Sequence, residues 1–166
     1  MTDQIKKKRI STRIGDIFCI QLKDGKTYFQ FIAVDASELN STTIRVFQKK
    51  YPLDYAFNAE EVVSDEIFFY AHTCLLAGLK QGLWTKIGKS KDIGDLNKVL
   101  FRNTDAWAPD HLKSYKWWVG GINGKYTMIG ELTQEYKIKT HMGWVVPPID
   151  IIEKIEFGEY QRVMPY

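Results

Sequence analysis

The alternation of apolar and polar residues predicts a β-hairpin at the start of the chain. Two runs within 13–34 are rich in β-branched and aromatic residues, and Asp24 and Gly25 separate them. This dipeptide suits a type I′ turn, because both central residues of that turn need φ > 0. Successive side chains of a strand point to opposite faces, and the first run is apolar on both faces. One face is expected to carry Phe18, Ile20 and Leu22, and the other Ile17 and Cys19.

The pattern predicts further strands with short helical or irregular segments between them. Strands are expected over 42–48, 67–76, 116–122, 125–130 and 143–146. Asn58, with an acid three residues later, predicts an N-cap and a short helical turn over 59–63. Asn123-Gly124 between two apolar runs predicts a second hairpin. Pro147-Pro148 is expected to end the last strand, and the apolar spacing over 149–155 fits a short helix or a further strand.

These elements predict a mainly β protein with short helices, of the α+β class. A hairpin covered on both sides belongs inside a barrel or sandwich. We expect a small SH3-like barrel or a strongly bent antiparallel sheet with an elaborated second half. The 166 residues contain no repeat, low-complexity tract or long linker, so a single domain over 1–166 is expected.

Composition and charge exclude few classes of function. Aromatic residues make up 14% of the chain, which favours strands, and the net charge of +3 is too small to imply nucleic acid by itself. Cys19 and Cys74 lie in apolar runs, so we expect buried free thiols in a reducing compartment. Neither a signal peptide nor an apolar run of membrane length is visible. We therefore expect a cytoplasmic protein without a membrane partner.

The chain carries few residues in patterns that indicate chemistry. The histidines His72, His111 and His141 have no metal-ligand spacing. His72 is expected to be a core histidine, and His111 and His141, in loop-like sequence, are expected at the surface. The segment 88–90 resembles the end of a phosphate-binding loop, but Leu83 stands where that loop needs glycine. We therefore expect no enzymatic activity, no cofactor and no metal. Cys74 with His72 is the enzymatic alternative, supported by residue identity alone.

Two segments have a composition that is typical of interaction surfaces. The acidic segment 54–66 contains no Lys or Arg, and it is either the solvated face of a loop and helical turn or a docking patch for a basic partner. Its acids are Asp54, Glu60, Glu61, Asp65 and Glu66. The segment 113–118 is either a core strand with lysine flanks or a stacking platform for single-stranded nucleic acid. Its basic and aromatic residues are Lys113, Tyr115, Lys116, Trp117 and Trp118.

Two sequence blocks resemble one family. The first is IGDIFCI at 14–20, followed by DGK at 24–26, and the second is GLWTKIG at 82–88, followed by Phe101. Over 13–101 this order resembles the immunity protein 26 family of bacterial polymorphic-toxin systems. The resemblance implies a non-enzymatic inhibitor that binds a toxin domain, and it supplies no catalytic residues. From the residues alone, Gly15 and Asp16 are expected at a turn and strand entry, and Trp84 and Ile87 in the core.

We expect an immunity protein that binds and neutralises a bacterial toxin through the five acids of 54–66. If the toxin is a nuclease, these acids are the expected contact, because a nuclease surface is built to receive phosphates. The alternative is a small β-barrel that binds nucleic acid, with binding that weakens as salt rises.

Overall fold

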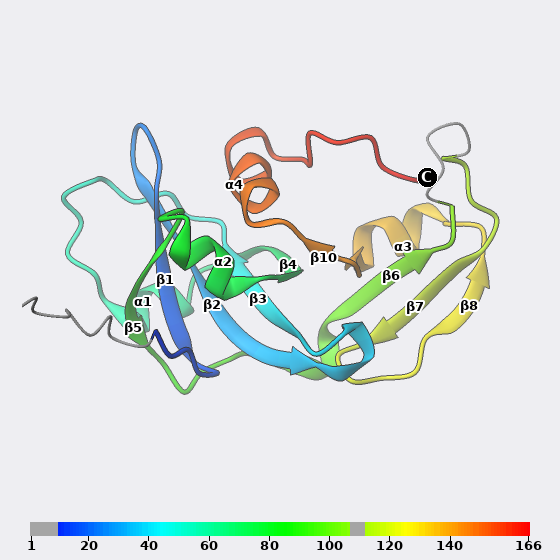
Figure 1. The fold of residues 1–166 in the computed structure, drawn as a ribbon, viewed down its shortest axis with the longest axis horizontal. Coiled ribbons are helices and arrows are strands. Elements are labelled where there is room, and N and C mark those ends of the chain that lie inside the picture. Colours follow the sequence, from blue (N-terminus) through cyan, green and yellow to red (C-terminus); the bar gives the residue numbers. More distant parts are fainter. Residues whose placement is uncertain (1–9, 107–111) are drawn as a thin grey trace, which may run out of the picture.

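Ten strands form two mixed sheets in the computed structural model, which describes residues 10–106 and 112–166 (Figure 1). The larger sheet has the order β10-β4-β3-β2-β1-β5. Its strands are β1 (Asp16–Gln21), β2 (Lys26–Asp35), β3 (Ser41–Phe47), β4 (Ile67–Thr73), β5 (Thr85–Lys89) and β10 (Val145–Val146). The smaller sheet has the order β8-β7-β6-β9. Its strands are β6 (Leu100–Thr104), β7 (Trp117–Gly121), β8 (Thr127–Gly130) and β9 (His141–Met142).

The larger sheet is bent and does not close into a barrel. Its outer strands β10 and β5 do not pair with each other in the described part of the chain. The register of β2 against β3 shifts between Phe31 and Ala33, and such a bulge bends a strand. Figure 1 shows β2 curving from the larger sheet toward the smaller one. The predicted mainly β, α+β fold is confirmed, in the form of a strongly bent sheet.

Within the described residues, three short α-helices and two 3₁₀ turns lie between strands, and a fourth α-helix follows the last strand. The helices are α1 (Ala59–Val63), α2 (Leu75–Lys80), α3 (Gln134–Lys139) and α4 (Pro148–Phe157), and the 3₁₀ turns are η1 (Ala36–Glu38) and η2 (Leu96–Lys98). The segment after Pro147 is therefore a helix, which Pro148 begins and Gly158 ends with φ 84°. Within 10–106 and 112–166, no helix has the length and apolar character that crossing a membrane requires.

Both faces of the first hairpin are buried, as predicted. Phe18 and Ile20 belong to a cluster that α2 and α4 cover with Leu75 and Ile151. Ile17, on the other face, belongs to a second cluster with Tyr28, Tyr51 and two valines of α1. The larger sheet is thus packed between helices on one side and the segment leading into α1 on the other.

The turn of the first hairpin differs from the prediction. Gln21 pairs with Lys26, which confirms the hairpin, but neither Asp24 nor Gly25 has a positive φ. A type I′ turn is therefore wrong, and the Leu22 N–H instead donates to the Gly25 carbonyl at 2.8 Å. Gly25 is required by close packing, because a β-carbon there would lie 2.7 Å from the Tyr51 carbonyl oxygen.

The apolar run over 67–76 is not one strand. Strand β4 ends at Thr73, and Cys74 is the exposed N-cap residue of α2. The expectation that Cys74 is buried is therefore wrong, because the run changes from strand to helix at this residue. Cys19 is partly buried. Trp84 is in the core as predicted and packs on Gly78, whereas Ile87 is 46% exposed because β5 is an edge strand.

A buried histidine–aspartate pair stands where the two sheets meet. His72 Nε2 lies 3.0 Å from Asp35 Oδ2, and His72 Nδ1 lies 2.8 Å from the Gly143 carbonyl oxygen. Both side chains of the pair are fully buried. Burial opposes ionisation of Asp35, but hydrogen bonds from Ser37 and Asn123 and the nearby His72 lower its pKa. The predicted role of His72 as a core histidine is confirmed, because both ring nitrogens have partners.

Candidate functional site

The five acids of the sequence-predicted interface lie on helix α1 or within five residues of its ends along the chain. We call Asp54, Glu60, Glu61, Asp65 and Glu66 the acidic surface. The Asn58 carboxamide oxygen accepts hydrogen bonds from the backbone N–H groups of Glu60 and Glu61 at 3.0 and 3.1 Å, which confirms the predicted N-cap. Val62 and Val63, buried on the opposite side of α1, hold the helix against the larger sheet. The packing of the two valines therefore fixes the position of α1, which carries Glu60 and Glu61 at the surface.

Two members of the acidic surface are held by neighbours within the chain. Glu61 lies 2.9 Å from Lys49 Nζ and accepts a hydrogen bond of 2.8 Å from the Tyr55 hydroxyl. The bonds from Lys49 and Tyr55 lower the pKa of Glu61. Asp65 accepts hydrogen bonds from the backbone N–H groups of Lys49 and Glu66, both at 2.8 Å. Glu61 and Asp65 therefore have structural partners already.

The other three acids are open to a partner. Asp54, Glu60 and Glu66 are exposed, and none of their carboxylates forms an ion pair with another residue that the structure describes. An incoming cation would not have to displace an ion-pair partner from them. Sequence reasoning missed the role of Lys49, which lies outside the acidic segment and neutralises part of it. The distance in sequence hides this pairing, since strand β3 ends before Lys49 and α1 follows ten residues later.

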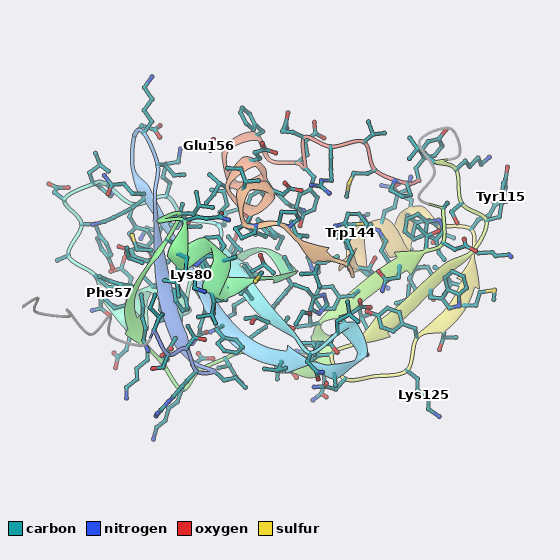
Figure 2. The ribbon with its side chains drawn as sticks, in the orientation of Figure 1. Phe57, Lys80, Tyr115, Lys125, Trp144 and Glu156 are labelled. Carbon is teal, nitrogen blue, oxygen red and sulfur yellow. The ribbon has the colours of Figure 1, made fainter. Side chains whose placement is uncertain are left out.

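The aromatic and basic residues over 113–118 do not form a continuous stacking platform. Trp117 is fully buried, whereas Trp118, next along β7, is half-buried. Tyr115 is 58% exposed, with Lys113 Nζ 5.0 Å from its ring centroid. Figure 2 shows Tyr115 at the outer end of the smaller sheet. Trp117 is therefore part of the core, and Tyr115 is the exposed ring of this segment.

The residues that an enzymatic hypothesis would use are not arranged together. His72 is fully buried with both nitrogens satisfied, while Cys74 is exposed beyond the end of β4. His141 is half-buried, which corrects the expected surface position, and His111 lies outside the described residues. No group of three or more His, Cys, Asp or Glu side chains in the described ranges could hold a metal ion.

Comparison with known proteins adds no relative: no family model, no curated protein and no solved structure matches this chain.

Proposed function

We propose that this protein is a bacterial immunity protein that binds a toxin domain by protein–protein contact and neutralises it without catalysis. The observation that supports this proposal most is the acidic surface, with Asp54, Glu60 and Glu66 exposed and without an intramolecular ion pair in the described structure. We place the protein in the cytoplasm, where such an inhibitor would protect the cell from the toxin.

The positions of the residues in the family resemblance fit this proposal. Gly15 adopts φ 96° immediately before β1, and Asp16 is buried at the start of that strand beside Lys86. Trp84 is buried and donates a hydrogen bond to the Leu75 carbonyl. These residues build the scaffold. The acidic surface is made by other residues, so it can differ in charge and shape without disturbing them.

The charge of the acidic surface suits a basic partner. Complementary charges raise the rate of association and select among partners more than they raise affinity. A nuclease that receives phosphates on a basic surface is the toxin class that fits this chemistry. Such a partner would meet Asp54, Glu60 and Glu66 directly, and it would compete with Lys49 for Glu61.

The proposal is tested with the product of the gene immediately upstream, by a pull-down and then by calorimetric titration at two salt concentrations. We expect a tight complex whose affinity falls as salt rises, because exposed charges are screened. If this product and the products of other neighbouring genes all fail to bind, the proposal is contradicted.

The alternative function is a nucleic-acid-binding module. Only the exposed ring of Tyr115 with Lys113 beside it favours this alternative, since Trp117 is buried and the larger sheet does not close into a barrel. A mobility assay with single-stranded oligonucleotides at low salt decides this question. Unchanged mobility would rule out the alternative.

A further inference from the structure

A pocket of about 380 Å³ lies where elements from both sheets approach one another. Strand β4 of the larger sheet and β6 of the smaller one contribute to its walls, together with α4, the end of α3 and the residues that follow α3. The C-terminal segment, red in Figure 1, runs from α4 across to the smaller sheet. There the Tyr166 backbone bonds to Leu112 and Ser114, so this segment is fixed at both ends.

Arg102 lines this pocket, and part of its guanidinium group has no protein acceptor in the described structure. Its Nη1 donates to the Thr140 carbonyl at 2.6 Å and to the Thr140 hydroxyl at 3.0 Å. Its Nε is buried and has no hydrogen-bond partner among the described residues. A buried donor without a hydrogen-bond partner raises the free energy of the folded protein. The Nε and Nη2 groups of an arginine can together donate two parallel hydrogen bonds to one oxyanion.

Lys154, on α4, is a second cation in the pocket wall. Its Nζ lies 4.6 Å from the ring centroid of Phe69 and 4.3 Å from that of Tyr160. The two rings hold the ammonium group, but they do not neutralise its charge. Burial, together with the charge of Arg102, lowers the pKa of Lys154 to about 8. The two cations are therefore close enough to repel each other.

The pocket supplies little negative charge to offset these cations. Neither Arg102 nor Lys154 forms an ion pair within residues 10–106 and 112–166. The described lining also contains two exposed charged residues of opposite sign, the acid Glu159 and the cation Lys137. The carboxylate of Asp150, also on α4, forms an ion pair with Arg162, in which Asp150 Oδ2 lies 2.5 Å from Arg162 Nε. Buried cations normally have a carboxylate partner, so this arrangement is typical of a site for an anion.

We propose that this pocket binds a small phosphate monoester, with Arg102 and Lys154 holding the phosphate group. A phosphate dianion offsets the charges of Arg102 and Lys154, whereas a carboxylate offsets only one of these two charges. The Tyr160 hydroxyl stays protonated, because burial raises its pKa, and it can donate a further hydrogen bond. Phe68, Ile138 and Met142 form an apolar part of the lining that can contact the organic group of the ester. A volume of this size admits a small molecule.

The site is separate from the proposed toxin interface, because it uses none of the five acids of the acidic surface. If no phosphate ester binds the pocket, the toxin proposal is unaffected. If no toxin binds the acidic surface, the pocket proposal is unaffected. The sequence alone does not predict this site, because Arg102 and Lys154 are far apart in the chain and neither lies in a phosphate-binding motif.

The test is calorimetric titration of the full chain with phenyl phosphate, inorganic phosphate and benzoate. We expect saturable binding of phenyl phosphate, with benzoate at least about tenfold weaker. A similar affinity for inorganic phosphate would support the site and assign its ligand as free phosphate. Equal binding of benzoate would overturn the phosphate assignment, and absence of saturable binding at millimolar concentrations would overturn the site itself.

Three variants test where the ligand binds. Lys154→Met keeps an unbranched side chain against Phe69 and removes the charge, and we expect it to lose at least about tenfold in affinity for phenyl phosphate. The matched control is Lys80→Met, at an exposed lysine on α2 that Figure 2 labels, and it should bind like the unmodified chain. Glu159→Gln should tighten binding, because it removes the negative charge beside the site. Equal affinity in all three variants would overturn the assignment.

Discussion

The backbone N–H of Asn123 donates a hydrogen bond of 2.9 Å to Asp35 Oδ1, which ties the β7–β8 loop to the end of β2. The Asn123 side chain adds a bond from its Nδ2 to the Val34 carbonyl at 3.0 Å, and its Oδ1 accepts from the Ala36 N–H at 2.7 Å. One residue of the smaller sheet's hairpin thus bonds to three consecutive residues at the end of β2 and the start of η1. This contact is one of those that join the two sheets.

Two substitutions of Asn123 distinguish the contribution of its side-chain hydrogen bonds to stability from that of its backbone conformation. Asn123 has φ 57°, which glycine adopts freely and alanine does not. We expect Asn123→Gly to lower the free energy of unfolding by about 1–2 kcal/mol, for two lost hydrogen bonds. Asn123→Ala should cost roughly another 1 kcal/mol because of the strained φ. Urea denaturation measures both, and an unchanged stability of the glycine variant would show that the side-chain bonds contribute nothing.

Removing the carboxylate of the buried pair should destabilise the fold strongly. Asp35→Ala leaves His72 buried beside an empty position and also removes the acceptor for the Ser37 and Asn123 N–H groups. Removing one partner of a buried, hydrogen-bonded pair that contains a carboxylate costs about 3–5 kcal/mol. The control is Asp24→Ala, which removes an exposed pair with Lys50 and should leave the thermal midpoint unchanged. Similar midpoints for the two variants would contradict a structural role for the Asp35–His72 pair.

The lowered pKa of Lys154 predicts a rise in stability at alkaline pH. Its pKa is about 8 in the folded protein and near 10.5 when unfolded. Between these values the unfolded chain holds more protons, so this group makes the protein more stable as the pH rises through that range. Below about pH 8 the penalty of the buried charge is present in full.

Lys154→Met removes that pH-dependent contribution. Its stability relative to the unmodified chain should therefore be highest near neutral pH and decline as the pH rises above about 8. Urea midpoints of both proteins at about pH 7.5 and 9.5 measure the difference. A difference that stays constant over this range would mean that Lys154 titrates as an ordinary exposed lysine.

Freeing Glu61 should strengthen binding of a basic partner. Lys49 occupies one carboxylate oxygen of Glu61, so a partner cation must compete with it. We expect Lys49→Met to raise the affinity for the toxin several-fold, mainly through faster association. Lys50→Met is a close control, because Lys50 pairs with Asp24 outside the acidic surface. If both lysine variants change the association rate equally, the effect comes from net charge and not from Glu61.

Local features of the fold were predictable from the sequence, and contacts between distant segments were not. Asn58 was predicted as an N-cap, because capping depends on the next three residues only. Asn123 was predicted as a turn residue, but nothing near it in sequence indicates its bonds to Val34 and Ala36. The end of β4 at Thr73 was missed, because an apolar run does not by itself distinguish strand from helix.

The candidate site was predictable in the same limited sense. Composition located the acidic surface, and the structure exposes Asp54, Glu60 and Glu66 on it. Composition could not show that Glu61 is paired with Lys49, since that pairing depends on how β3 and α1 are placed.

The central claim is that the exposed acids of the acidic surface bind the toxin. The most direct measurement is the affinity of Glu60→Lys/Glu66→Lys for the upstream gene product, beside the control Glu131→Lys/Glu156→Lys, which makes the same charge change elsewhere. Glu156, labelled in Figure 2, lies near the end of α4. We predict that the first variant loses at least about tenfold in affinity and that the control loses far less, with both folded. Equal affinities of the two variants would contradict the account.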